Sequence, residues 1–299
     1  MLDRTQLETF AKVIEYGSFR RAADSLSITQ SAVSQRIRAL EEAVGTPLLM
    51  REAPVRPTHA GDGILRHIVA LRLLEQDTLR CITRDRFPPA AYAIAVNADS
   101  LATWFESLAW ALAKEHIALE LVVDDQDHTL DALMRGDVMG CVSTNPESLV
   151  GFIAEPLGSM SYRCVCSQHL AARKFQAGLT VPAVTDIPAI LFNRKDGLHD
   201  SFLRLYFGFE VRRYTKHYFP SPVALLAAIR QSLGYGLAPA MQVDDLIAGG
   251  ELIDLAPTRS LPVKLYWHRW ESEPGPAADV TKLVLMHARS SLEPIGRLA

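Results

Sequence analysis

Cysteine is scarce in this chain. Only four occur among 299 residues, and no two of them have the C-x-x-C spacing of a metal-binding or redox motif. None of the nine histidines lies at a diagnostic spacing from a cysteine, so we expect no metal site and no cofactor. We predict that all four thiols are small buried apolar side chains. The alternative is a redox sensor, because Cys164 and Cys166 share one face of an expected strand.

Long apolar runs are also absent. No stretch approaches the roughly 18 to 20 apolar residues of a membrane span, and residues 1–12 carry charges where a secretory signal would be apolar. We therefore expect a cytoplasmic protein with no membrane partner. A hydrophobic content of 48% and a charged content of 22% are typical of a soluble globular chain. Because 299 residues exceed one comfortable core, we expect two or three domains.

Motifs of catalysis are missing as well. The chain has no G-x-S-x-G elbow, no phosphate-binding P-loop and no complete G-x-G-x-x-G. The glycine pair at 234 and 236 continues into Leu237-Ala238-Pro239, where a phosphate-binding helix would be required. We therefore predict that the protein is not an enzyme and has no catalytic residues.

The chain has no large excess of basic charge, since its net charge is −3. Binding of duplex DNA depends largely on neutralising phosphates, so a DNA partner requires a local concentration of cations. Residues 1–90 contain 13 Lys and Arg against 11 Asp and Glu. The candidate basic patch in this part comprises Arg20, Arg21, Arg36, Arg38, Arg51 and Arg56.

Residues 18–41 carry two short helical patterns joined by a tight polar break, which is typical of a helix-turn-helix DNA reader. Ser18 and Thr29 are candidate N-caps of the two helices. The first helix has a small apolar stripe at Phe19, Ala22, Ala23 and Leu26, and the second turns Ala32, Val33, Ile37 and Leu40 inward.

The other face of the second helix is polar. Hydrogen-bonding side chains distinguish base edges in the major groove, and cations bind the phosphates. The candidate DNA-binding residues are Thr29, Gln30, Ser31, Ser34, Gln35, Arg36 and Arg38, with Arg51 and Arg56 on an expected wing. That wing consists of a strand over residues 48–50 and a second strand over residues 51–57. The alternative for such a helix face is ordinary solvated surface.

Residues 1–60 resemble the DNA-binding domain of LysR-type transcriptional regulators. The resemblance rests on Phe10, Gly17-Ser18-Phe19, Ala22-Ala23, Leu26, Thr29-Gln30-Ser31-Ala32-Val33-Ser34, Ile37, Leu40-Glu41, Gly45 and Pro47-Leu48-Leu49. It implies an α/β protein with an N-terminal winged helix-turn-helix, a long linker helix and a two-lobed, periplasmic-binding-protein-like effector domain. The implied bounds are 1–60, 58–90 and 91–299, with lobe II at about 162–266.

Thr58 is a candidate N-cap of that linker helix, which we expect to continue to Phe87-Pro88-Pro89. Its apolar stripe comprises Ile64, Leu65, Ile68, Leu71, Leu74, Leu79 and Ile82. Pairing with the same helix of a second subunit would set two recognition helices at a fixed spacing, so we expect a homodimer or homotetramer. The alternative is packing on the chain's own effector domain.

From Tyr92 onward, strands alternate with helices. We expect strands at 93–96, 119–123, 140–143 and 190–192, and helices at 99–113 and 129–135. Such alternation predicts a parallel sheet with ligand sites at the carboxyl ends of its strands. The candidate effector-binding residues are Asn97, Asp99, Ser100, Thr103, Trp104, Asp124, Asp125, Ser143 and Asn193. The alternative for these acidic residues is helix capping and solvated turns.

Acidic side chains around a cleft favour a cationic ligand, and a helix N-terminus near Ser100 favours a carboxylate. Four stretches, at 95–104, 124–129, 135–140 and 265–270, resemble the ArgP/LysG subgroup of the family, which controls basic amino acid export. The resemblance implies double-stranded DNA and lysine or arginine as partners, activation of an exporter gene, and RNA polymerase as a further candidate partner. The alternatives are another effector, a cysteine redox sensor, or an architectural DNA-binding protein without an effector.

Overall fold

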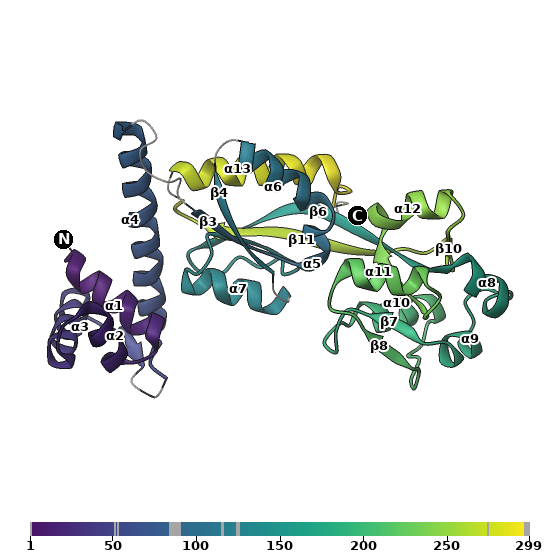
Figure 1. Cartoon of the computed structure of the whole chain (residues 1–299), viewed down its shortest axis with the longest axis horizontal. Coiled ribbons are helices and arrows are strands. Elements are labelled where there is room, and N and C mark those ends of the chain that lie inside the picture. Colours follow the sequence, from purple (N-terminus) through teal and green to yellow (C-terminus); the bar gives the residue numbers. More distant parts are fainter. Residues whose placement is uncertain are drawn as a thin grey trace.

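The computed structural model describes residues 2–50, 52, 54–83, 91–114, 117–123, 126–273 and 275–295. An N-terminal helical domain is followed by one long helix and then by an elongated part with two lobes (Figure 1). The N-terminal elements are α1 (Arg4–Tyr16), α2 (Phe19–Leu26), α3 (Gln30–Val44), β1 (Leu49–Met50), β2 (Arg56–Pro57) and the long helix α4 (His59–Thr83).

The three N-terminal helices form because local signals start each of them and a shared apolar core holds them together. The side chains of Asp3, Ser18 and Thr29 accept the backbone N–H three residues later, which satisfies a donor that the first helical turn leaves free. The predicted caps at Ser18 and Thr29 are confirmed. The largest fully buried side chains of this core are Phe10, Ile37, Leu40 and Leu48.

The wing is shorter than predicted. Strands β1 and β2 pair antiparallel over only two residues each, with Leu49 opposite Pro57 and Met50 opposite Arg56. The prediction of a second strand over residues 51–57 is therefore wrong for its described residues before Arg56, and Arg51 lies outside the described residues. Thr58 caps α4 through a hydrogen bond from the N–H of Gly61 to Thr58 Oγ1 at 3.1 Å, as predicted.

Much of the apolar stripe of α4 is exposed. Leu71, Leu74, Leu79 and Ile82 are among the exposed large apolar side chains, and Ile82 is 73% exposed. Nearer the start of α4, Ile64 and Ile68 belong to the core of the N-terminal domain. Pairing of the exposed stripe with a second copy of the chain stays a prediction. Residues 84–90, where we expected the helix to end, lie outside the described residues.

The two lobes share one mixed sheet. Its strands in the first lobe, called lobe I, are β3 (Ala91–Val96), β4 (Ala118–Val123) and β5 (Gly140–Ser143), and those in lobe II are β7 (Ala189–Leu191), β8 (Lys216–Tyr218), β9 (Tyr235–Pro239) and β10 (Leu252–Asp254). Two long strands, β6 (Phe152–Ser167) and β11 (Leu261–Trp270), connect the lobes. The strand order is β4-β3-β5-β11-β6-β9-β7-β8, and β10 pairs with β6.

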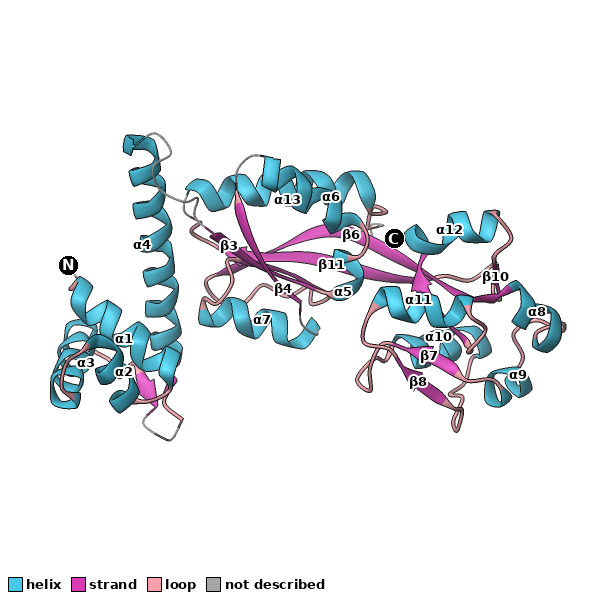
Figure 2. Ribbon diagram, in the orientation of Figure 1, coloured by secondary structure: helices cyan, strands magenta, loops and turns pink. Residues whose placement is uncertain are grey.

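The prediction of a parallel sheet is only partly right. Strand β3 pairs parallel with β4 and β5, but β11 pairs antiparallel with β5 and β6, and β6 also pairs antiparallel with β9. The two long antiparallel strands carry the chain between the lobes (Figure 2). Since the expected bounds of lobe II fall inside these strands, the domain bounds stay predictions.

Helices cover both faces of this sheet. Lobe I carries α5 (Ala98–Leu101), α6 (Trp104–Lys114), α7 (Gln126–Arg135) and α13 (Gly275–Ser291). Helices α6 and α13 lie on one face and α7 on the other (Figure 2). Lobe II carries α8 (Gln168–Lys174), α9 (Val181–Asp186), α10 (Leu198–Phe207), α11 (Pro222–Arg230) and α12 (Ala240–Ala248).

The single helix predicted over residues 99–113 is in fact two helices. The chain leaves the helical path after Leu101, and α6 starts at Trp104. In this turn the hydroxyl of Thr103 donates to the carbonyl of Asp99 at 2.6 Å, which holds the two helices at a corner. This corner lies just after the carboxyl end of β3, so it fixes the position of the residues between β3 and α6.

We predict that Gly140→Ala destabilises lobe I. A Cβ at this position would lie 2.1 Å from Cζ2 of Trp267, a buried ring that cannot move away freely. We expect a loss of about 1–3 kcal/mol of unfolding free energy, measured by urea denaturation at pH 7. The control is Gly197→Ala, where nothing lies within 4 Å of the added Cβ. Equal stability of the two variants would contradict the prediction.

Candidate functional site

The exposed face of α3 is polar along its whole N-terminal half. Gln30, Ser31, Gln35 and Arg38 are exposed, while Val33, Ile37 and Leu40 are buried on the opposite face. The hydroxyl of Thr29 caps the helix by accepting a hydrogen bond of 3.2 Å from Ala32 N. The geometry thus leaves a row of amide, hydroxyl and guanidinium groups facing outward, as base and phosphate recognition requires.

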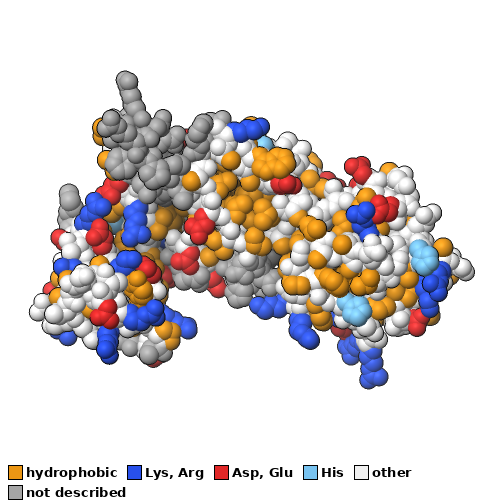
Figure 3. Space-filling model, in the orientation of Figure 1, with side chains coloured by type: hydrophobic (Ala, Val, Ile, Leu, Met, Phe, Trp, Pro, Cys, Tyr) orange, Lys and Arg blue, Asp and Glu red, His pale blue; other side chains and the backbone are white. Residues whose placement is uncertain are grey.

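Two of the predicted DNA-binding side chains also have contacts inside the domain. The hydroxyl of Ser34 donates to the carbonyl of Gln30 at 3.0 Å, and Nη1 of Arg36 donates to the hydroxyl of Thr9 at 3.3 Å, which ties α3 to α1. Arg56 is exposed on the wing. In the view of Figure 3, acidic and basic side chains are interspersed over the N-terminal domain.

A small cavity lies between the two lobes. Its lining residues are Asp99, Tyr162, Ile190, Phe192, Asp196, Leu198, His199, Pro222, Leu225, Leu237, Ala238, Pro239 and Gln242. Most of this wall is apolar, and none of the described lining residues is Lys or Arg. A hydrogen bond of 3.3 Å from Nε2 of Gln242 in lobe II to the carbonyl of Ala102 in lobe I bridges the lobes beside it.

Asp99 is the lobe I carboxylate of this cavity. It follows β3 directly, as predicted, and its Oδ2 accepts a hydrogen bond of 2.6 Å from the hydroxyl of Tyr162 on β6. Burial raises the pKa of Asp99, and the nearby negative charge of Asp196 raises it further, against the effect of the Tyr162 hydrogen bond. A cation bound here would favour the ionised carboxylate.

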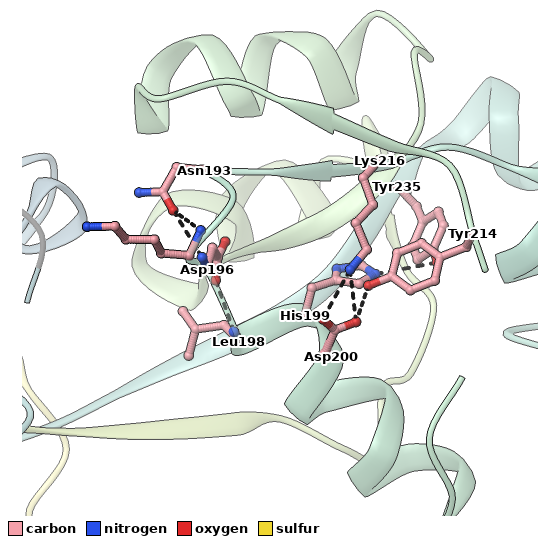
Figure 4. Close-up of polar contacts among 9 residues, drawn as sticks. Asn193, Asp196, Leu198, His199, Asp200, Tyr214, Lys216 and Tyr235 are labelled. Carbon is pink, nitrogen blue, oxygen red and sulfur yellow. Dashed lines mark hydrogen bonds and ion pairs between the residues drawn. The ribbon is translucent and has the colours of Figure 1, made fainter. Parts of the chain in front are cut away.

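Asp196 is the lobe II carboxylate, and it was not among the candidate effector-binding residues chosen from the sequence. Its Oδ1 accepts from Leu198 N at 2.9 Å (Figure 4). Its Oδ2 accepts from Phe192 N at 3.2 Å, so the backbone fixes its orientation. Asn193, which was selected, uses its Oδ1 to accept from the N–H groups of Lys195 and Asp196. The Asn-x-x-Asp spacing of such a turn was the signal that could have pointed to Asp196.

The other candidates near β3 and β5 are placed as follows. Within the described part of the chain, Asn97 Oδ1, Ser100 Oγ and Trp104 Nε1 are buried without a hydrogen-bond partner. None of these three side chains lines the cavity. Thr103, in the turn after α5, donates to the carbonyl of Asp99, and the hydroxyl of Ser143 accepts from Asn145 N at 3.2 Å. Asp124 and Asp125 lie outside the described residues.

A polar cluster in lobe II includes His199, which lines the cavity. His199 is 1% exposed, and its Nε2 lies 3.4 Å from the hydroxyl of Tyr235. Burial lowers the pKa of His199 to about 4, so the ring is neutral at pH 7. Burial also acts on Asp200, but hydrogen bonds from Tyr214 and Lys216 prevail and lower its pKa (Figure 4).

The described cysteines are inert thiols. Cys141, Cys164 and Cys166 are free and buried, as predicted. Burial raises the pKa of Cys141 and Cys166 to about 12, which disfavours the reactive thiolate and argues against the redox alternative for these three. Among the described residues, no group of three or more His, Cys, Asp or Glu is arranged to hold a metal ion. No described helix is long and apolar enough to cross a membrane.

Comparison with known proteins decides the family. Residues 4–62 match the bacterial regulatory helix-turn-helix protein family of the lysR type, and residues 108–288 match the LysR substrate binding domain. The chain is a LysR-type transcriptional regulator. It is 40% identical over 295 residues to the HTH-type transcriptional regulator ArgP of Aeromonas salmonicida, covering 98% of this chain and 99% of the relative.

Solved structures agree with this assignment. The crystal structure of ArgP from Mycobacterium tuberculosis has a TM-score of 0.86 and 35% identity, covering 98% of this chain and all of that one. Full-length LysG from Corynebacterium glutamicum, solved with bound effector Arg, has a TM-score of 0.81 and 32% identity over the same shares. The regulator thus belongs to the ArgP/LysG subgroup, and the expectation that it is not an enzyme is confirmed.

We predict that His199 makes lobe II of this LysR-type regulator sensitive to acid. Because its folded-state pKa is about 4 and its usual value is 6.5, the unfolded chain binds a proton more readily between these pH values. Stability is therefore lost as pH falls from 6.5 to 4, by about 3 kcal/mol from this group. His199→Gln should reduce the difference between the unfolding free energies measured by urea denaturation at pH 7 and at pH 4.5.

The control for this measurement is His217→Gln, which removes an exposed histidine of the same lobe. Asp200, whose pKa is lowered from 3.8, loses its contribution mainly below the measured pH range, and it remains in both variants. A pH dependence in His199→Gln equal to that of the wild type would contradict the assignment.

Proposed function

We propose that this regulator responds to a basic amino acid, lysine or arginine, bound between its two lobes, and that it activates the gene of an exporter for that amino acid. The observation that carries the proposal is the pair of carboxylates, Asp99 and Asp196, which line one apolar cavity from opposite lobes. Within the described residues neither carboxylate forms an ion pair. The bound effector Arg of the related LysG structure supports the same ligand class.

The chemistry of the cavity fits such a ligand. Two carboxylates with no Lys or Arg among the described lining residues favour a cation over an anion. The apolar walls, including Phe192 and Leu237, suit the methylene chain of a lysine or arginine side chain. Asn97, Ser100, Thr103, Trp104, Asp124, Asp125, Ser143 and Asn193 remain proposed effector-binding residues alongside Asp99.

Binding requires the lobes to move. The free space inside the cavity is about 20 Å³, roughly the room of one water molecule and far too small for an amino acid. We propose that the lobes separate relative to this structure to admit the ligand, with loss of the bond between Gln242 and the carbonyl of Ala102. A ligand that changes the preferred separation of the lobes provides the regulator with two states.

The DNA-binding side is the polar face of α3 together with the wing. We propose that Gln30, Ser31, Ser34 and Gln35 read base edges, while Arg36, Arg38, Arg51, Arg56 and the capped helix start at Thr29 hold the phosphates. The regulator would act as a homodimer or homotetramer through α4 and would contact RNA polymerase at the promoter.

We predict that Asp196→Asn weakens arginine binding by about 10- to 100-fold, because a charge-assisted hydrogen bond contributes about 1.5–3 kcal/mol. Asp99→Asn should weaken it similarly. The measurement is calorimetric titration with lysine, arginine and leucine. Asp245→Asn, an exposed carboxylate on α12, is the matched control. Unchanged arginine affinity in both cavity variants, or equal heat from leucine, would exclude the proposed site.

We predict that Gln35→Ala relaxes the sequence preference at one base position by about 1–3 kcal/mol, since its exposed amide can pair with a base edge. Affinities for an operator selected from a random duplex library and for its single-base variants measure this effect. Glu42→Ala, exposed near the end of the same helix, should leave the preference intact. Uniform weakening across all variants would instead assign Gln35 to the DNA backbone.

A further inference from the structure

One side chain of the linker helix is inserted into lobe I. Arg66, Val69 and Ala70 are spaced three and four residues apart on α4, so they share one face of the helix. Val69 and Ala70 pack on the apolar cluster that contains Leu133 of α7. Arg66 Nη1 donates a hydrogen bond of 2.7 Å to the carbonyl oxygen of Met134. The contact thus joins α4 to the last turn of α7.

The carbonyl that Arg66 reaches is one that the end of α7 leaves free. The N–H of Asp137 bonds to Ala132 O at 2.9 Å, and the N–H of Gly136 bonds to Leu133 O at 3.1 Å. This is the Schellman arrangement, which satisfies those two carbonyls but not that of Met134. A guanidinium at this position completes the cap and also opposes the negative end of the helix dipole.

Two further contacts fix the guanidinium and the helix behind it. The guanidinium carbon lies 4.9 Å from the centre of the Phe152 ring at the start of β6. Gly136 has a φ of +78°, and a Cβ there would lie 3.2 Å from the backbone nitrogen of Arg66. Burial lowers the pKa of Arg66, with Asp62 acting in the opposite direction. Arg66 therefore contacts both α7 and the strand that connects the lobes.

Helix α7 connects this contact with the effector cleft. Strands β3 and β4 pair parallel, so the residues that follow them meet at one edge of the sheet. Asp99 follows β3 at that edge, and α7 begins at Gln126, shortly after β4 ends. The ten residues of α7 span roughly 15 Å. A movement of lobe I at the cleft therefore reaches Arg66 through one rigid helix.

We propose that Arg66 is the positioning residue that couples the effector domain to the DNA-binding domain. It does so by fixing the orientation of α4 relative to the C-terminal end of α7. Helix α4 is continuous with the wing, since the carbonyl of Leu48 accepts from Thr58 N at 3.0 Å. Any rotation of α7 against β6 is transmitted to α4 and to the recognition helix. Without the Arg66 contact, the two domains respond independently.

The test uses the full chain and an operator selected from random duplexes by the wild-type protein. The operator dissociation constant is measured with and without saturating arginine; such coupling ratios are typically about 5- to 150-fold. In Arg66→Met we expect the ratio to fall below about twofold, while the affinity for arginine alone changes less than about twofold. Arg66→Lys, which keeps the charge and a donor, should recover part of the ratio. Arg72→Met removes an exposed arginine of the same helix and is the matched control.

Gly136→Ala tests the same contact from the other side, because its Cβ would press on α4 and its positive φ disfavours alanine. If Arg66→Met does not fold, the coupling ratio of Gly136→Ala tests the contact instead. A wild-type ratio maintained in both Arg66→Met and Gly136→Ala would overturn the proposal. So would a loss of arginine binding together with the coupling, since that indicates a merely structural role.

The coupling ratio rests on the proposed effector, so a second measurement is independent of it. Hydrogen exchange of α7 is compared with and without operator DNA, in the absence of arginine. We expect operator binding to change the exchange of α7 in the wild type and not in Arg66→Met. If the wild type binds no arginine but shows this change, the proposed effector fails and the role of Arg66 stands. If operator DNA leaves α7 unchanged in the wild type, the role of Arg66 fails.

Discussion

The pairing of β6 with β11 is the constraint on which the effector domain depends. The two strands are paired over ten residues of β11, with a register shift between Leu265 and Tyr266. Strand β11 also pairs with β5 in lobe I, while β6 continues to β9 and β10 in lobe II. These two strands join β4-β3-β5 of lobe I and β9-β7-β8 of lobe II into one sheet, so a movement of the lobes relative to one another bends them. Tyr162, which binds Asp99, lies on β6 where it is paired with both β11 and β9.

The N-terminal domain was predictable because its determinants are local. Each helix start depends on a capping side chain and an N–H three residues later, and each buried face on a spacing of three or four residues. Both can be seen within a dozen residues of sequence, so the caps at Ser18 and Thr29 and the polar face of α3 followed directly. The wing was less predictable, because two-residue strands contain too few residues for an alternating pattern.

The cavity was only partly predictable because its walls come from distant parts of the chain. Asp99 was found from its place after a strand, but Tyr162, Asp196 and Gln242 join it only through the order of strands in the mixed sheet. Antiparallel pairing of β6 across both lobes has no local signature. Polar residues after a strand also look alike in sequence. Only the structure shows that Asn193 serves the turn while Asp196 faces the cavity.

In the proposed effector site, the electrostatics that would select a cationic ligand also provide a reason for the lobes to respond to it. Burial, with a further contribution from the negative charge of Asp196, raises the pKa of Asp99 and so disfavours its ionised form in the cavity. In the proposed site, a cation bound beside Asp99 would stabilise its ionised form, and it would thereby change which separation of the lobes has the lowest free energy. In the proposed coupling, that change also acts on the linker helix, because α7 runs from the edge of the sheet to the contact with Arg66. Ligand charge, lobe separation and the orientation of α4 are then parts of one equilibrium.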